Sequence, residues 1–128
     1  MIIKFVNQFK YKLNSKQNYL LYKFTKNILY LSILLYYYNY FLKIYIFIIS
    51  NKYFIFIILN KFKNLNYLKI YLKYNQIFYI KYKNLFKFIK FYKYFKGILI
   101  LYSFKYKFIT HFSAIKYKEG GILMFYIY

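Results

Sequence analysis

Residues 97–128 read GILILYSFKYKFITHFSAIKYKEGGILMFYIY, and the order of apolar, polar and glycine residues here predicts the fold of the C-terminal half. The apolar run at 98–103 is typical of a strand, and a lysine-containing turn follows it. Thr110 suits the N-cap of a short helix at 111–117, because its hydroxyl can accept a hydrogen bond from a free backbone N–H. Gly120 and Gly121 predict a turn into a closing strand at 122–127. Two glycines there permit a positive φ and close approach of the backbone to something large.

Two helices are expected near the beginning of the chain. Apolar residues spaced three and four apart, such as Phe5, Phe9 and Leu13, indicate a helix at 3–13. A second helix is predicted at 25–37, with Thr25 as its boundary residue.

Strands follow these helices and lead to the C-terminal stretch. Isoleucine-rich runs at 44–49 and 54–59, separated by a Ser-Asn-Lys turn, predict a hairpin. Further strands are expected at 68–74 and 77–82, and a short basic helix or a loop at 86–95. The predicted fold class is α+β, with an N-terminal α/β subdomain at 1–62 and a strand-rich C-terminal subdomain with a short helix at 63–128.

The composition excludes most kinds of catalytic and metal site. The 128 residues include 22 lysines, no arginine, no cysteine and one carboxylate side chain, Glu119, with a formal net charge of +21. A pair of catalytic carboxylates, a cysteine nucleophile and a multi-histidine metal site are therefore all impossible. We predict that the chain is not an enzyme and holds no metal or cofactor. His111 by itself is expected to be a structural hydrogen-bonding residue.

The residue usage also indicates an extremely AT-rich gene. Lys, Asn, Tyr, Phe, Ile and Leu dominate the chain, and all can be encoded with A and T alone. Gly and Ala need two G or C bases per codon, and the chain keeps only Gly97, Ala114, Gly120 and Gly121. Because these residues are retained despite the codon bias, we expect that the C-terminal quarter contains positions where no other residue is tolerated.

The charge predicts a polyanionic partner, either nucleic acid or anionic lipid, because a net charge of +21 repels itself in a compact state. The longest uncharged run, residues 27–42, would span about 24 Å as a helix, less than the roughly 30 Å hydrocarbon core of a bilayer. Lys43 alone interrupts 27–51, and snorkelling of its side chain would rescue a span. The alternative class is therefore a small organelle-encoded membrane subunit of a respiratory or ATP synthase complex, which would use 27–51 and 53–60 as tilted or interrupted spans.

The C-terminal stretch resembles the C-terminal domain of the small-subunit ribosomal protein S-eight family, which binds ribosomal RNA directly. That family ends in Ser-Thr-Ser-x-Gly, two apolar residues, Thr, Asp/Asn/His, two residues, Ala, five residues, Gly-Gly-Glu and an apolar strand. Aligned without gaps, the matching positions are Ser103, Thr110, His111, Ala114, Gly120 and Gly121. Phe104 and Lys105 replace the family's Thr and Ser, Lys107 replaces its Gly, and Ile122 replaces its Glu. In the N-terminal half, Asn39 stands where the family has Gly, and Asn is the other residue that best adopts the left-handed conformation.

The resemblance implies a two-part protein that binds small-subunit rRNA early and helps to form the platform of the subunit. It implies RNA-binding residues at Ser103, Phe104, Lys105, Lys107, Thr110, His111, Gly120 and Gly121. Since Phe104 and Lys105 replace two hydroxyls, we predict that stacking and phosphate attraction take the place of some hydrogen bonding. The expected partners are small-subunit rRNA and neighbouring ribosomal proteins. The AT-saturated composition and the lack of an import signal predict a mitochondrially encoded protein of the mitochondrial ribosome.

Overall fold

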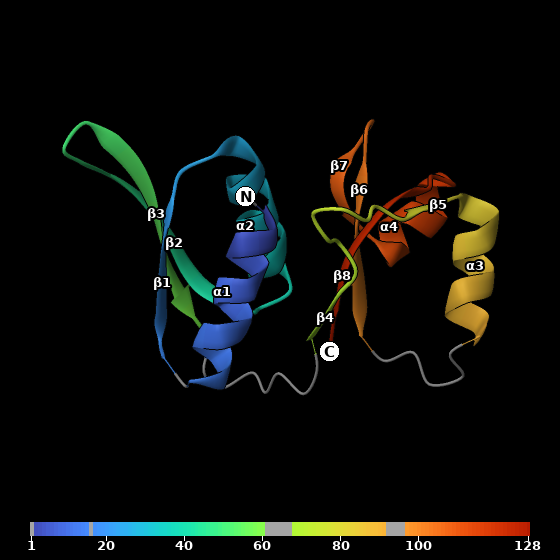
Figure 1. The fold of residues 1–128 in the computed structure, drawn as a ribbon, viewed down its shortest axis with the longest axis horizontal. Helices are drawn as coiled ribbons and strands as arrows, with labels where there is room; N and C mark the ends of the chain where they lie inside the picture. Colours follow the sequence, from blue (N-terminus) through green and yellow to red (C-terminus); the bar gives the residue numbers. More distant parts are fainter. Residues whose placement is uncertain (1, 16, 61–67, 92–96) are drawn as a thin grey trace. The chain divides into compact units, whose positions relative to one another are not determined.

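A computed structural model describes residues 2–15, 17–60, 68–91 and 97–128. The chain divides into two compact units, Met1–Asn64 and Leu65–Tyr128, close to the subdomain boundary expected at 62/63, which itself lies outside the described residues. Both units combine helices with antiparallel sheet (Figure 1). The α+β fold class is therefore confirmed.

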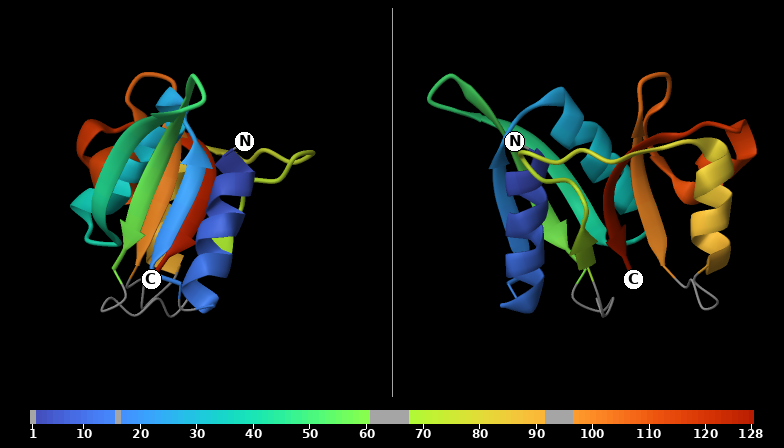
Figure 2. Two further views of the ribbon diagram at one scale, coloured as in Figure 1. Left: turned by 90° about the vertical axis from the view of Figure 1, so that its left-hand side faces the viewer. Right: turned by 45° about the vertical axis from the view of Figure 1, so that its right-hand side comes forward.

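Unit 1 packs two helices on a three-stranded sheet. Its elements are α1 (Ile2–Asn14), β1 (Tyr19–Lys23), α2 (Lys26–Tyr37), β2 (Phe41–Ile49) and β3 (Lys52–Leu59). The strand order is β1-β3-β2, with both pairings antiparallel, so β1 and β2 are the edge strands. Figure 2 shows the sheet with α1 and α2 on one face.

The core of unit 1 lies between these helices and the sheet. Phe5 and Phe9 of α1 are fully buried, and the ring of Phe9 meets Phe41 of β2 edge to face, with 5.1 Å between centroids. On β3, Ile55 and Ile57 point to the helices and are also buried. The alternation of β3 therefore leaves its other side chains on the face that the helices do not cover.

Capping and turn residues of unit 1 follow the sequence pattern. The Thr25 side chain accepts a hydrogen bond from the backbone N–H of Ile28, which makes Thr25 the N-cap of α2 and confirms the expected helix boundary. Asn39 has a φ of 66°, the left-handed conformation expected from its sequence position. Ser50 and Asn51, with φ of 49° and 61°, form the turn of the predicted hairpin, and two positive φ values suit the twist of a two-residue hairpin loop.

Unit 2 contains an antiparallel sheet, in which the strand order differs from the sequence order, and two helices. Its elements are β4 (Leu68–Ile70), β5 (Tyr79–Ile80), α3 (Tyr82–Phe91), β6 (Ile98–Ser103), β7 (Lys107–Thr110), α4 (His111–Tyr117) and β8 (Gly121–Ile127). The strand order is β4-β8-β6-β7, and β5 also pairs with β8. A buried cluster of Leu85, Leu99, Leu101, Ile109, Ala114 and Leu123 joins α3 and α4 to the sheet.

Several expectations from the sequence need correction. The strands β1 and β7 are not among the expected elements, and β7 occupies residues that were expected to form a turn. The strands expected at 68–74 and 77–82 are only the short β4 and β5, joined through a bridge between Lys73 and Gln76. The helix α3 begins at Tyr82, four residues before the expected helix or loop at 86–95, of which 92–95 lie outside the described residues.

The uncharged run at 27–42 does not form one element. It covers most of α2, the bend at Asn39 and the first residues of β2. Across the described residues, the structure has no helix that combines the length and the apolar character needed to cross a membrane.

Candidate nucleic-acid interface

The turn between β6 and β7 is held by the side chain of Ser103. Its Oγ accepts hydrogen bonds from the backbone N–H groups of Lys105 and Tyr106, at 3.2 and 3.4 Å. Ser103 pairs with Lys107 across the ladder, so Phe104, Lys105 and Tyr106 form a three-residue loop. Lys107 closes the loop with a φ of 63°, as three-residue hairpin loops require. Glycine would adopt this φ without strain, whereas lysine adopts it at a cost.

The turn presents rings and ammonium groups to solvent. The Phe104 side chain is 74% exposed, and Lys105 and Lys107 are exposed as well. The Tyr106 ring stacks on Tyr117 of α4, with 4.7 Å between centroids and 17° between planes. The Nζ of Lys105 lies 5.2 Å from the centroid of Tyr106.

The last turn of α4 adds a further ammonium group beside this stack. The Nζ of Lys116 lies 5.8 Å from the centroid of Tyr117. We call Phe104, Lys105, Tyr106, Lys107, Lys116 and Tyr117 the turn cluster. Aromatic faces beside ammonium groups can stack on bases while the cations neutralise phosphates.

Thr110 and His111 are buried at the start of α4. The Thr110 hydroxyl accepts a hydrogen bond from the backbone N–H of Ser113 at 3.4 Å, so the predicted N-cap is confirmed. The Nδ1 of His111 accepts a hydrogen bond from the backbone N–H of Leu99 at 3.1 Å, which ties α4 to β6. Burial lowers the pKa of His111 from 6.5 to about 4, so its imidazole is neutral at pH 7. The expected structural role of His111 is confirmed.

The glycines have a different role from the one expected. The structure has no positive φ at any described glycine, and the left-handed residue after α4 is Lys118, with a φ of 54°. A Cβ on Gly121 would lie 2.7 Å from the carbonyl oxygen of Tyr102, and a Cβ on Gly120 would collide with the carbonyl oxygen of Ile80. The close backbone approach is therefore real, but the neighbour is the protein's own sheet.

Packing also accounts for the other two residues that resisted the codon bias. A Cβ on Gly97 would collide with the carbonyl oxygen of Ile127, and Ala114 is fully buried in the cluster that joins α4 to the sheet. All four positions are thus constrained by space inside unit 2. Their retention is explained without any ligand.

The structure divides the eight predicted RNA-binding residues into two groups. Phe104, Lys105 and Lys107 are brought together on the exposed turn. Ser103, Thr110, His111 and Gly121 are buried and Gly120 is half-buried, so these residues support the turn and α4 from within.

Sequence reasoning overlooked the other members of the turn cluster, Tyr106, Lys116 and Tyr117. The signal available was the alternation of lysine and aromatic residues from 104 to 107 and again at 116–118. In a chain where both residue types are abundant, this alternation does not stand out.

No family model matches the chain, and no curated protein matches it.

Proposed function

We propose that this chain is a structural constituent of a small ribosomal subunit, that it binds small-subunit rRNA directly, and that it supports platform assembly and translation. The turn cluster is the observation that carries this proposal. It places an exposed Phe104 and a stacked tyrosine pair beside lysines on a turn that Ser103 holds in shape. Such a surface can stack on unpaired bases and attract phosphates, as single-stranded loops of RNA require. Ser103, which holds this turn, is one of the residues that match the S-eight family.

We further propose that the ribosome is mitochondrial and that neighbouring ribosomal proteins are the other partners. The charge of +21 supports an rRNA partner, since neutralised phosphates would relieve the repulsion among the lysines. The AT-limited residue usage supports an organelle gene.

Binding of small-subunit rRNA to matched variants tests the role of the turn cluster. Phe104→Ala should weaken binding at least about fivefold through lost stacking. Lys105→Ala should lower the salt slope of the binding constant by about one unit. Tyr74→Ala and Lys87→Ala are the controls, because both side chains are exposed in unit 2 outside the cluster. If the turn variants match the controls in affinity and salt slope, the turn is not the interface.

Co-sedimentation tests the assignment to the ribosome. The protein should sediment with the small subunit and leave it when EDTA or high salt disrupts the particle. A chain that stays in the membrane pellet after carbonate extraction would instead be the membrane subunit of a respiratory or ATP synthase complex, and the ribosomal proposal would be wrong.

A further inference from the structure

The outer face of the unit 1 sheet, opposite α1 and α2, is an ordered array of aromatic, aliphatic and lysine side chains. Antiparallel partners point to the same side of a sheet, so the pairing register defines three rows across β1, β3 and β2. The rows are Tyr19, Ile58 and Lys43; Leu21, Phe56 and Tyr45; and Lys23, Phe54 and Phe47. We call these nine residues the sheet platform.

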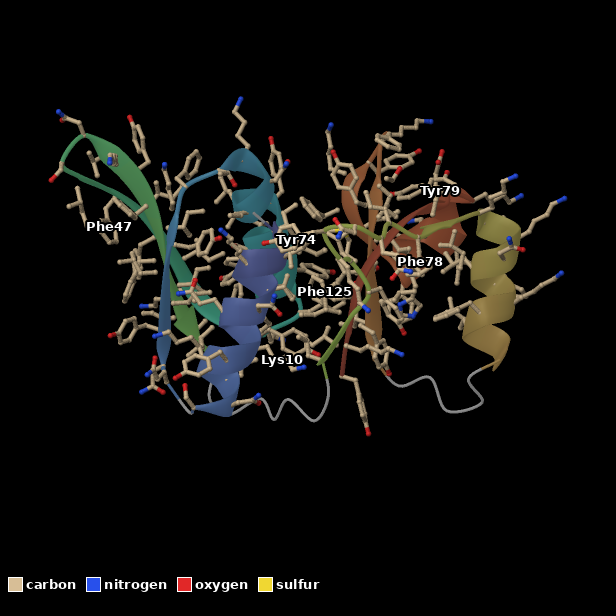
Figure 3. All side chains as sticks on the ribbon, viewed as in Figure 1. Lys10, Phe47, Tyr74, Phe78, Tyr79 and Phe125 are labelled. Carbon is tan, nitrogen blue, oxygen red and sulfur yellow. The ribbon has the colours of Figure 1, made fainter. Side chains whose placement is uncertain are left out.

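Aromatic rings cluster at the centre of the platform around Phe56. Its ring centroid lies 5.7 Å from that of Tyr19, 6.4 Å from that of Tyr45 and 6.3 Å from that of Phe47. Tyr45 and Phe47 remain 46% and 36% exposed. Figure 3 shows Phe47 on the side of the sheet away from the helices. These rings therefore do not complete the core of unit 1, which lies on the other face.

Lysines border this aromatic centre. Lys23 and Lys43 occupy opposite corners of the platform, and Lys52 lies on the same face beyond Phe54. The Nζ of Lys12, from α1, lies 5.3 Å from the centroid of Tyr19 and brings a further ammonium group to the β1 edge. Corners four residues apart along the strands and two strands apart are about 16 Å from each other. Cations at that separation can contact non-adjacent phosphates of one strand, on either side of bases stacked between them.

The charge of residues 1–64 indicates which kind of partner the sheet platform would bind. Residues 1–64 contain no Asp or Glu, and their lysines are Lys4, Lys10, Lys12, Lys16, Lys23, Lys26, Lys43, Lys52, Lys61 and Lys63. A second copy of the chain would bring the same charge to the face and be repelled. A single strand of nucleic acid matches both the rings and the lysines of the platform, because its bases stack on rings and its phosphates pair with lysines.

We propose that the sheet platform is a second nucleic-acid site, which binds unpaired nucleotides of single-stranded RNA by stacking on Tyr45 and Phe47 and by phosphate contacts to Lys23 and Lys43. It extends the proposed function to another surface, and it rests on that function only for the source of the RNA. Because any base has a face that stacks, the site is expected to have little sequence preference.

Binding of the full chain to a short uridine oligonucleotide tests the proposal without any ribosomal component. Tyr45→Ser and Phe47→Ser should each weaken binding at least about fivefold, whereas Tyr45→Phe should retain most of the affinity. Lys23→Gln and Lys43→Gln should each reduce the salt slope by about 0.7. Tyr30→Ser is the matched control, since Tyr30 is 48% exposed on α2, outside the platform. Thermal unfolding shows whether each variant retains the fold.

The outcomes separate this inference from the proposed function. Loss of oligonucleotide binding in folded Tyr45→Ser and Phe47→Ser supports the platform, even if the protein fails to sediment with ribosomes. Oligonucleotide binding equal to that of Tyr30→Ser overturns the platform, even if rRNA binding through the turn cluster is intact. If folded platform variants bind the oligonucleotide normally but no longer join the small subunit, the face docks a protein and the proposal is wrong.

Discussion

Single residues of this chain show how a biased composition still encodes specific conformations. Lys107 and Lys118 adopt left-handed backbone conformations in which glycine is the usual residue. Gly97, Gly120 and Gly121 are retained where a side chain has no room. Glycine is thus kept where space is lacking, while lysine is accepted where only the backbone conformation is unfavourable.

Lys107→Gly and Lys118→Gly should each stabilise the protein by up to about 1 kcal/mol. Each substitution removes a left-handed non-glycine residue, and the greater flexibility of glycine in the unfolded chain offsets part of the gain. Urea unfolding provides the measurement. Lys105→Gly is the control, because Lys105 is exposed without a positive φ and should lose stability when replaced by glycine. Equal losses in all three variants would contradict the role of strain.

His111 should make the protein less stable as the pH falls from about 6.5 to 4. Above this range the imidazole is neutral in both states, and within it the unfolded chain binds a proton that the folded protein resists. The free energy of unfolding should fall by about 3 kcal/mol in total, at 1.36 kcal/mol per pKa unit. Unfolding measured between pH 7 and 5 is informative, because no other side chain type in this sequence ordinarily titrates there. In His111→Gln this pH dependence of the free energy of unfolding should disappear. A dependence that persists in this variant would show that another group causes it.

At the scale of elements, β8 organises unit 2, because β4, β5 and β6 all pair with it. It starts at Gly121, whose backbone lies against Tyr102 of β6. The start of β8 therefore tolerates no side chain. The helix α4 ends before it, at Tyr117, with Lys118 as its C-cap.

Gly121→Ala should destabilise the protein by about 1–3 kcal/mol, the usual cost of forcing extra atoms into a packed interior. The added Cβ would lie 2.7 Å from the carbonyl oxygen of Tyr102 and would push β6 and β8 apart. Chemical unfolding measures the effect, and hydrogen exchange at β6 and β8 should show the local loss of protection. An unchanged free energy of unfolding would show that the strands do not approach this closely.

Helices with local signals were predictable, whereas the strand β1, which depends on a distant partner, was not. The helices α1, α2 and α4 have apolar periodicity or a hydroxyl N-cap within a few residues of sequence. The strand β1 is five residues long and is fixed by pairing with β3, which lies more than thirty residues further along the chain. The sheet platform could not be predicted for the same reason, because its rows form only when β1, β3 and β2 pair in register.

The turn cluster was partly predictable for the same reason. Phe104, Lys105 and Lys107 lie close together in the sequence, directly after the apolar run at 98–103. Tyr117 joins them only through its stack on Tyr106 across the fold.

At the scale of the whole molecule, charge dominates the behaviour of the free protein. Its 22 lysines are set against one carboxylate side chain, which gives a net charge of +21, so repulsion opposes the folded state. The melting temperature should rise when sodium chloride is increased from 50 to about 500 mM, and it should rise further with inorganic polyphosphate, which binds the lysines directly. Differential scanning calorimetry measures both effects. A melting temperature that falls with salt would mean that favourable ion pairs outweigh repulsion.

The edge strand β2 has a consequence for the fate of unassembled copies. From Ile44 to Ser50 the sequence IYIFIIS has no charge and no proline, and Tyr45, Ile46, Phe47, Ile48 and Ile49 are all exposed. An exposed strand of β-branched and aromatic residues is a template for intermolecular cross-β stacking. Lys43 and Lys52 are the charges that flank it and act as gatekeepers against fibril formation. Where high salt or high concentration overcomes the repulsion among the lysines, copies of this chain are therefore expected to aggregate through β2.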